Sequence, residues 1–500
     1  MINVRSNHAR RTALAAVLGG ATLALLSGCM VGPDYQRPAD TRSTHFDAQA
    51  EQKLEHVPND GAPSVAYDAH IDTDWWTLFH SPRLDGVVKL AIEGNRDLDA
   101  ANATIAQANE AIAAAGGALQ PQVAFGAQAG RQRTGFGTGR STSNVYAVGP
   151  SVSFDLDLFG GTRRRIEEAT ALADLERHRF DAAYLTVTGE VATQAIQFAS
   201  ARAQIAAVND LIATDRHNLA LVSSAKQYGS ATSADIALAQ SQLAQDETLL
   251  PPLEQQRDVA RHALSVLAGK GPADWVPPDF GLADFTLPAA LPLSLPSELA
   301  RQRPDILAAE AQLHAASAAV GVATADRYPH LQLSGALTQA SAGAGVGTLW
   351  NLFGGLAGPL FDGGTLKANQ RGAADAYDAS MARYQQTVVI ALGQVADVLQ
   401  AISHDADGYA AQGRALDAAE TSLRLSQQGF AAGDASVLAV LDAQRARQRA
   451  LVGQIQARTA QYLDAVQLAV ALGGQSGEAF LRKAPHEPSL LTQGNTSRSP

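Results

Sequence analysis

The chain has little cysteine, little methionine and few aromatic or charged side chains. Its 500 residues include one cysteine and three methionines, and only 6% are aromatic and 17% charged. A single cysteine excludes a disulfide framework and any zinc or iron–sulfur site built from several thiolates. So few sulfur atoms also disfavour a relay of soft ligands for copper or silver. The sequence therefore predicts no metal site.

Positive charge is also scarce relative to negative charge. The 49 acidic residues outnumber the 38 basic ones and give a net charge of −11. A negative chain repels phosphate backbones, so nucleic acid is not an expected partner. The Gly-x-Ser-x-Gly, His-Glu-x-x-His and Gly-Lys-Ser/Thr motifs of common enzymes do not occur. We therefore expect a protein that is not an enzyme and that needs no cofactor other than a covalent lipid.

The N-terminus has the features of an export signal that ends in a lipidated cysteine. Three arginines precede an apolar run that ends at Leu26 and that is shorter than the ~20 residues needed to span a bilayer. The following Leu26-Ser27-Gly28-Cys29 resembles the bacterial lipobox, in which the thiol takes a diacylglyceryl group. Two or three acyl chains on Cys29 would anchor the chain firmly, since each buried methylene contributes ~0.8 kcal/mol.

The rest of the chain repeats itself. A shift of 208 residues superposes Asn95-Arg96-Asp97-Leu98 on Arg303-Pro304-Asp305-Ile306, and a shift of 203 superposes Gly160-Gly161-Thr162 on Gly363-Gly364-Thr365. Such self-similarity indicates an internal duplication. The predicted segments are a signal peptide (1–28), a lipidated strap (29–80), a first repeat (81–270), a proline-rich linker (271–296), a second repeat (297–475) and a flexible tail (476–500).

Each repeat is predicted to contain a helix, two strands and a long helical hairpin. The strands are expected at 122–133, 144–158, 330–339 and 348–360, because apolar and polar residues alternate there between glycine-rich turns. Such strands suit either an ordinary soluble sheet or a membrane barrel that is apolar outside and polar inside. In the barrel, Asp155 and Asp157 would point into the lumen, although Asp157 could instead precede the next helix.

The hairpin helices are expected to be very long. Residues 161–200 and 364–403 contain no proline, and forty helical residues span ~60 Å. Helices of this length pack side by side in a coiled-coil-like array. The chain is predicted to turn back near 201–204 and 405–408. The glycines at 229 and 433 are interpreted as interruptions of the returning helices, followed by Thr232 and Ser436 as N-caps.

The strand count requires more than one chain if the strands cross a membrane. Four strands cannot close a barrel, because the smallest membrane barrels have eight. A dimer would give eight strands and a filled interior, whereas a trimer would give twelve strands with an open lumen. The same trimer would supply twelve long helices. We therefore favour a homotrimer.

Several motifs occur in a fixed order along the chain. They are Cys29-Met30-Val31-Gly32-Pro33-Asp34-Tyr35-Gln36-Arg37-Pro38, Trp75-Trp76-Thr77-Leu78-Phe79 with Pro82-Arg83-Leu84, Leu158-Phe159-Gly160, Arg303-Pro304-Asp305-Ile306 and Phe361-Asp362-Gly363-Gly364. Together they resemble the TolC-like family of outer-membrane efflux factors, in the lipoprotein branch related to OprM and NodT.

The resemblance implies a mixed α and β membrane protein. Its trimer would form a 12-stranded outer-membrane β-barrel, with four strands per protomer, continuous with a 12-helix periplasmic α-barrel and an equatorial domain. The protein would be anchored in outer-membrane lipid with a periplasmic extension. It would act as a passive exit duct for small toxic compounds or drugs, delivered by an inner-membrane pump of the RND or MFS type through a periplasmic adaptor.

Two alternatives remain at this stage. A type I protein-secretion duct shares the fold, and a periplasmic helical scaffold lipoprotein would place the strands in a soluble sheet. The lipid anchor and the Val-Gly-Pro-Asp-Tyr start resemble the drug-efflux branch more closely. The exported compound does not follow from this chain, because in such assemblies the inner-membrane pump selects it.

Gating is the expected chemistry at the hairpin tips. Three copies of a lumen-facing acid would bring like charges together, and Asp397, Asp405 and Asp407 lie near the predicted second tip while Arg202 lies at the first. We expect Asp397 and one tip acid to line a cation-sensitive constriction, with Arg202 as an ion-pair partner. The alternative is that Asp405 and Asp407 cap a turn and face water.

Overall fold

The computed structural model describes residues 30–39, 41–55, 64–67, 73–134, 141–342 and 345–473. Its chain divides into two compact units. One contains the strap up to Ala39 with residues 103–177 and 308–387, and the other contains residues 40–102, 178–307 and those from Val388 onward. The predicted signal peptide (1–28), Cys29 and the predicted tail (476–500) lie outside the described residues.

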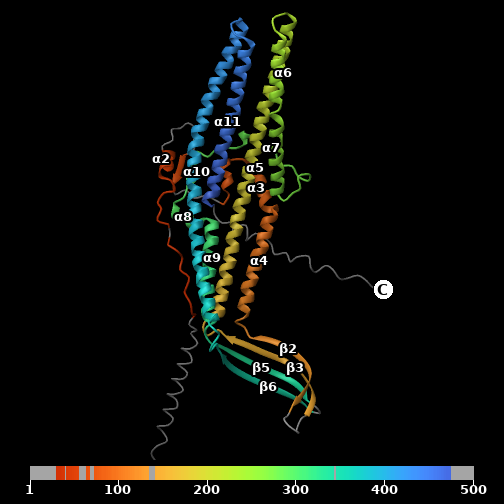
Figure 1. Cartoon of the computed structure of the whole chain (residues 1–500), viewed down its shortest axis with the longest axis vertical. Helices are drawn as coiled ribbons and strands as arrows, with labels where there is room; N and C mark the ends of the chain where they lie inside the picture. The colour runs from red at the N-terminus through yellow and green to blue at the C-terminus, as the bar shows by residue number, and fades with distance from the viewer. Residues whose placement is uncertain are drawn as a thin grey trace, which may run out of the picture. The chain divides into compact units, whose positions relative to one another are not determined.

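The first unit contains a four-stranded antiparallel sheet (Figure 1). Its strands are β2 (Gln122–Thr134), β3 (Ser141–Leu156), β5 (His330–Ala342) and β6 (Gly345–Ala357), in the order β2-β3-β5-β6. The two central strands come from different repeats, so neither repeat forms the sheet alone. The second and fourth strands were predicted at 144–158 and 348–360, and both begin three residues earlier and end two or three residues earlier than predicted.

Helices lead into and out of this sheet. Helix α4 (Arg96–Gly117) precedes β2 and α9 (Pro304–Ala325) precedes β5, while α5 (Gly161–Gln227) and α10 (Thr365–Ala432) follow the second strand of each repeat. Helices α4 and α9 are rich in alanine, the strongest helix former, and its small side chain lets neighbouring helices approach closely. The two repeats therefore share one order of elements.

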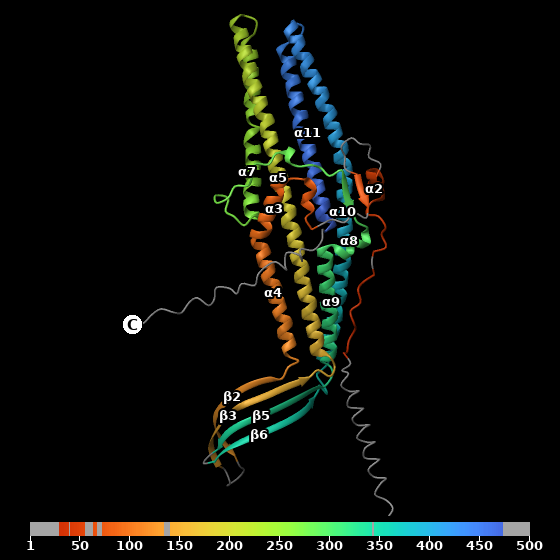
Figure 2. The same ribbon diagram turned by 180° about the vertical axis from the view of Figure 1, so that it is seen from behind.

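The second unit contains two helical hairpins that lie side by side in both views (Figures 1 and 2). Helix α5 returns through α6 (Ser233–Glu247) and α7 (Leu250–Leu267), and α10 returns through α11 (Val437–Leu472). The hairpins touch through Asn218, whose amide donates to Gln444 at 2.7 Å. Thr232 and Ser436 cap the returning helices, as the sequence predicted.

The predicted turns at 201–204 and 405–408 are wrong. Helices α5 and α10 continue through both segments for 67 and 68 residues, about 100 Å each. The segments contain no proline, and Gly408 alone costs a helix only about 1 kcal/mol. The chain turns instead at Gly229 (φ 79°) and Gly433 (φ 83°), which adopt a left-handed backbone. These are the positions interpreted from the sequence as mere interruptions.

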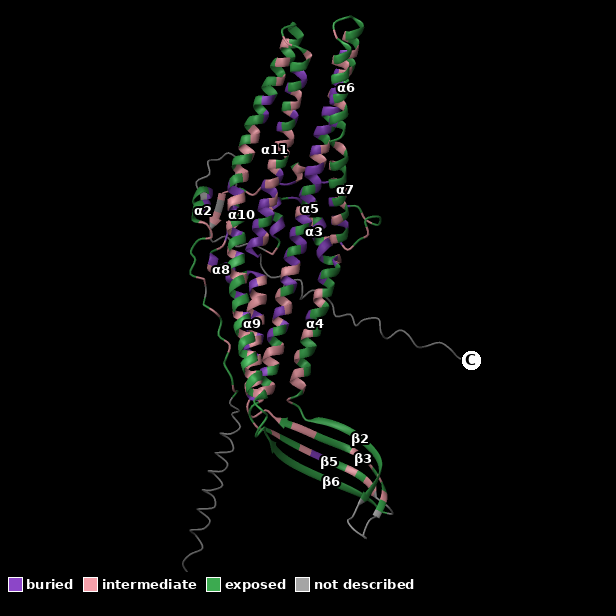
Figure 3. Ribbon diagram, viewed as in Figure 1, coloured by how far each residue is buried: buried purple, intermediate pink, exposed green. Residues whose placement is uncertain are grey.

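Buried residues gather in the helices of the second unit (Figure 3), and an aromatic cluster lies among them. Trp75, Trp76 and Phe79 of helix η1 (Trp75–Phe79) are all at most 2% exposed. Phe79 packs edge-on against Phe285 and against Tyr462 of α11. The proline-rich segment predicted to be an extended linker thus supplies core side chains. It also contains η2 (Leu282–Asp284) and β4 (Ala290–Leu293).

Short elements complete the second unit. Strand β4 pairs in parallel with β1 (Ser64–Tyr67). Helices α3 (Pro82–Gly94) and α8 (Pro296–Gln302) precede α4 and α9 in the two repeats. Helix α2 (Ala48–Glu55) belongs to the segment predicted to be a strap, which is therefore partly regular structure.

The glycine after α7 is expected to be the most sensitive of the left-handed glycines. Gly269 has φ 68°, and a Cβ there would lie 1.9 Å from the carbonyl oxygen of Gly94, whereas a Cβ at Gly229 meets nothing within 4 Å. Gly229→Ala should cost only the left-handed strain of about 1–2 kcal/mol. Gly269→Ala should lower the melting temperature, followed by circular dichroism, clearly further than Gly229→Ala. Equal losses in the two variants would contradict this packing argument.

Candidate channel wall and anchor site

The sheet carries an apolar face that is exposed in the single chain. Strand register places Val123 opposite Val152, Phe154 opposite Leu333, and Leu331 opposite Leu356, so apolar side chains of all four strands share one face. Phe125 is 73% exposed and Trp350 78%. An apolar surface spread over four strands is far more than a soluble monomer normally shows to water.

The opposite face is mainly polar. It carries Ser151, Ser153 and Asp155 on β3, with Gln332 and Ser334 opposite Asp155 and Ser153 on β5. Asp155 is exposed, as the lumen prediction requires of it. The strands have 13 to 16 residues, which exceeds the ~9 to 11 that a tilted membrane strand needs.

Both edges of the sheet are open. Among the described residues, β2 and β6 each pair with a strand on one side only. Each edge therefore presents a row of backbone N–H and C=O groups without a partner strand, which is a template for pairing with another chain. One chain of this protein thus supplies a four-stranded sheet that further strands could extend at both edges.

Asp157 does not project from a strand. Its carboxylate accepts hydrogen bonds from the backbone N–H groups of Thr162 at 2.9 Å and Arg163 at 3.0 Å. The side chain is 8% exposed. Carboxylates stabilise helix N-termini by accepting from the free N–H groups there. Asp157 therefore caps α5, which corrects the prediction that it lines the lumen and agrees with the alternative that it precedes a helix.

The strap is fastened to the junction between β3 and α5. The backbone N–H of Val31 donates to the carbonyl of Phe159 at 3.1 Å. The guanidinium of Arg164 is 1% exposed, donates to Asp34 at 2.7 Å and to the carbonyl of Val31 at 3.3 Å, and is paired with Glu167 at 2.7 Å. A buried guanidinium is stable only when such partners surround it.

A second set of contacts fixes the strap on α9. The Tyr35 ring stacks on His314 at 4.3 Å, and Arg37 pairs with Glu310 at 2.9 Å. The His314 ring also lies 3.0 Å from Glu167, the partner of Arg164. The strap therefore contacts helices of both repeats. Its first described residue, Met30, follows the predicted lipid site Cys29.

The predicted gate residues lie within helices rather than at a tip. Arg202 donates to the carbonyl of Phe280 at 2.9 Å, which pins the loop that follows α7. Lys53 of α2 donates to Asp407 at 2.7 Å and holds the pKa of that carboxyl below its usual value. Asp397 is an exposed residue of α10, and Asp405 faces Asp464 of α11. Their assignment to hairpin tips is wrong because both helices continue beyond them.

Two carboxyl pairs were missed by the sequence analysis. Asp215 of α5 pairs with Asp246 of α6, both of them buried, and the buried Asp464 of α11 pairs with the half-buried Asp405 of α10. Asp215 is 4% exposed and Asp464 is 6% exposed. Burial is the main cause that raises the pKa of each of these two groups to about 7, and the neighbouring carboxyl adds to it.

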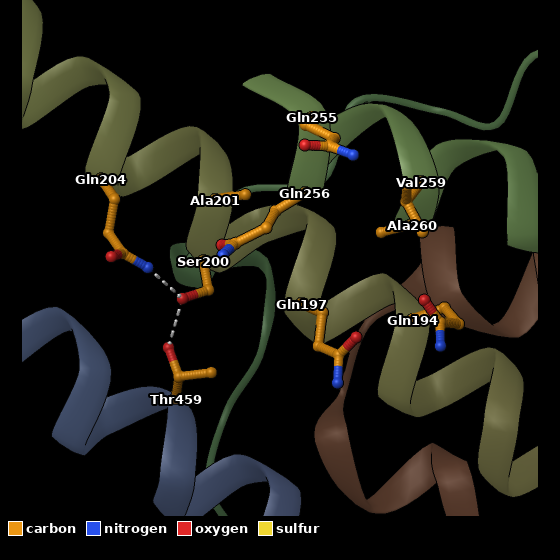
Figure 4. A pocket seen from close by; sticks show the side chains of 10 residues that line it. All are labelled: Gln194, Gln197, Ser200, Ala201, Gln204, Gln255, Gln256, Val259, Ala260 and Thr459. Carbon is orange, nitrogen blue, oxygen red and sulfur yellow. Dashed lines mark hydrogen bonds between the residues drawn. The ribbon is translucent and has the colours of Figure 1, made fainter. Parts of the chain in front are cut away.

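A cavity of about 460 Å³ lies beside α5, α7 and α11 in the second unit (Figure 4). Five glutamines line it, and Ser200 links two of its walls by accepting from Thr459 at 2.8 Å and from Gln204 at 3.1 Å. Amides and hydroxyls without a titratable group cannot act as acid, base or activated nucleophile. Within the described residues no group of three or more histidine, cysteine, aspartate or glutamate side chains could hold a metal ion.

Replacing Arg164 should release the strap. The charged hydrogen bonds that Arg164→Gln removes are worth about 1.5–3 kcal/mol each, so amide hydrogen exchange at residues 31–37 should accelerate by about tenfold or more. Arg165→Gln is the matched control, because Arg165 is 52% exposed and pairs only at the surface with Asp326. Equal exchange in the two variants would show that the buried guanidinium does not hold the strap.

Comparison with known proteins agrees with this architecture. The outer membrane efflux protein family matches residues 87–270 and 295–474, once for each repeat. The pyoverdine export outer membrane protein OpmQ of Pseudomonas putida is 31% identical over 421 residues, which cover 81% of this chain and 88% of OpmQ. Nodulation protein T of Rhizobium leguminosarum bv. viciae is 28% identical over 492 residues, which cover 95% and 96% of the two chains.

A solved structure gives the same result for the fold. The outer-membrane channel OprN superposes with a TM-score of 0.81 at 28% identity, over 89% of this chain and 99% of OprN. Two matched repeats, the shared order of helices and strands and the extent of these alignments lead to one assignment. The chain belongs to the outer membrane efflux protein family.

Proposed function

We propose that this outer-membrane efflux channel works as a homotrimer in which the three sheets close one 12-stranded barrel and the helical hairpins form a tube. The observation that carries the proposal is the sheet with one exposed apolar face and two open edges. In hydrocarbon every backbone N–H and C=O must be paired, which only closure of the sheet achieves. The mainly polar face, including Asp155, would then line the lumen.

Lipidation of Cys29 would add an anchor in the outer membrane. The strap supports this part of the proposal, because the backbone N–H of Val31 donates to the carbonyl of Phe159, three residues after β3 ends at Leu156. An acyl chain carried two residues before Val31 would therefore start close to the end of a proposed membrane strand. The remainder of the protein would extend into the periplasm.

The proposed gate and docking end lie at the hairpin turns, at 228–232 and 433–436. They replace Asp397, Asp405, Asp407 and Arg202 as gate candidates, since both helices continue past those residues. A periplasmic adaptor would dock there, and an inner-membrane pump of the RND or MFS type would deliver the compound. Transport through the duct itself would be passive, with the energy supplied at the inner-membrane pump.

The relatives favour small-molecule export over the alternatives. OpmQ is named for pyoverdine export, and TtgF of Pseudomonas putida is named for toluene efflux, which supports an efflux duct more than a type I protein-secretion duct. A soluble scaffold lipoprotein would have to keep Phe125 and Trp350 in water, at a cost that the proposed membrane location removes.

The proposal is tested with the purified full-length protein. Native mass spectrometry should give three chains, and insertion into planar bilayers should give discrete ion currents. Deletion of its gene should raise sensitivity to exported toxic compounds, and the wild-type gene should restore tolerance. A monomer without channel activity would overturn the proposal in favour of the scaffold alternative.

Charge should be tolerated on only one face of β3. Val148 lies at mid-strand on the apolar face and the adjacent Ala147 lies on the other face, opposite Gln128. A lysine on the lipid side of a barrel costs about 2–4 kcal/mol at the bilayer midplane. Val148→Lys should therefore reduce the amount of SDS-resistant trimer in outer membranes, whereas Ala147→Lys should assemble and alter ion selectivity. The opposite outcome would reverse the assignment of the two faces.

A further inference from the structure

The two carboxyl pairs occupy equivalent kinds of place in the two hairpins. Asp215 and Asp246 join α5 to α6, and Asp405 and Asp464 join α10 to α11. Each pair therefore bridges the outgoing and the returning helix of one hairpin. Two other side chains contact the first pair. Arg445 of α11 faces it, and the amide of Gln242 donates to Asp246.

One carboxylate oxygen in each pair lacks a hydrogen-bond donor within the described ranges of the chain. Among the described residues, no N–H or O–H donor reaches the Oδ2 atom of Asp215 or of Asp464. Two adjacent carboxylates in a buried site cannot both stay ionised, and a proton shared between them supplies the missing hydrogen bond. For Asp464, the only charged group acting on it from the described part of the chain is Asp405.

Comparison of the repeats shows that the fold does not need these acids. With the shift of 204 that superposes Gly229 on Gly433, the first pair corresponds to Ala419 and Ala450, and the second pair to Ala201 and Ala260. All four alanines are at most 9% exposed. The position that Asp215 and Asp246 occupy in the first hairpin is thus occupied in the second by Ala419 and Ala450, which pack in one cluster of buried residues.

A buried carboxyl pair is the more costly solution, since each ionised carboxylate loses several kcal/mol of hydration. Alanine at the same position packs without that cost and gives close helix contact. Each hairpin nevertheless carries one acidic contact, at a different level from that in the other hairpin. This arrangement indicates a role for the acids in something other than packing.

We propose that the Asp215–Asp246 and Asp405–Asp464 pairs are proton-binding sites. When the pH falls, protonation of each pair stabilises the contact between the two helices of its hairpin. The protonated pair is a hydrogen bond between the two helices, and the deprotonated pair is a repulsion between them. The consequence for transport rests on the proposed function, because the hairpins would form the wall of the periplasmic tube.

The direction of the pH effect follows from linkage. The closed hairpin holds the shared proton up to a pH of about 7, whereas a carboxyl in an opened hairpin releases it above about 3.9. Between these limits the opened state binds fewer protons, so raising the pH favours opening. The opening equilibrium should rise by up to about tenfold per pH unit for each pair, and should level off above pH 7.

Hydrogen exchange of the full-length protein tests the proposal. Amide exchange in 210–220 and 458–468, corrected for its intrinsic pH dependence, should accelerate several-fold between pH 5 and pH 7 in the wild type. In Asp215→Asn with Asp464→Asn, an amide replaces the shared proton, and exchange should no longer depend on pH. Asp210→Asn, an exposed position on α5, is the matched control and should behave as the wild type.

The alanine contacts of the other repeat provide a second variant. Asp215→Ala with Asp246→Ala copies Ala419 and Ala450, so it should fold and lose the pH dependence in the first hairpin only. Flat corrected exchange in the wild type, or pH dependence that survives in the asparagine variant, would overturn the proposal. Ion currents in planar bilayers test the duct separately, because a channel without proton-dependent hairpins would still conduct.

Discussion

The unpaired backbone groups at the two edges of the sheet are the constraint on which the rest of the structure depends. Four strands place their apolar side chains on one face, yet β2 and β6 each have a partner strand on one side only. In water such edges invite aggregation, and in hydrocarbon each unpaired group costs several kcal/mol. The proposed closed ring of three chains would pair the backbone groups at both edges.

The sheet is built from both copies of the duplicated unit. Each repeat contributes two strands, and the central β3–β5 pairing joins them, so the sheet cannot form from one repeat. The helices of the two repeats also correspond to one another. Alanine-rich α4 and α9 enter the sheet, and α5 and α10 leave it as continuous helices of nearly equal length. The repeats differ in two groups of side chains. One holds the strap at the junction of β3 and α5, and the other forms the carboxyl pairs.

Strands and caps could be predicted because their signals are local. Alternation in Tyr146–Leu156 and the residues Thr232 and Ser436 specify their structures without distant partners. The hairpin turns were misplaced because a helix ends only where the backbone requires it, and the left-handed Gly229 and Gly433 looked like interruptions. Because of that error the carboxyl pairs were not recognised. Asp405 and Asp464 lie opposite each other only when the chain turns near Gly433 rather than near Asp405. Asp157 was ambiguous because a cap and a strand end occupy neighbouring positions.

The strap has a consequence for the order of events during folding. Its contacts reach far along the chain, since Tyr35 bonds to Glu310, 275 residues away, and Arg164 to Asp34, 130 residues away. Contacts between distant segments form late, because the loop between them must close first. The N-terminal segment is the first part of the chain to leave the ribosome, yet its contacts with Glu310 and His314 can form only after α9 of the second repeat has folded. Until then this segment can adopt many conformations.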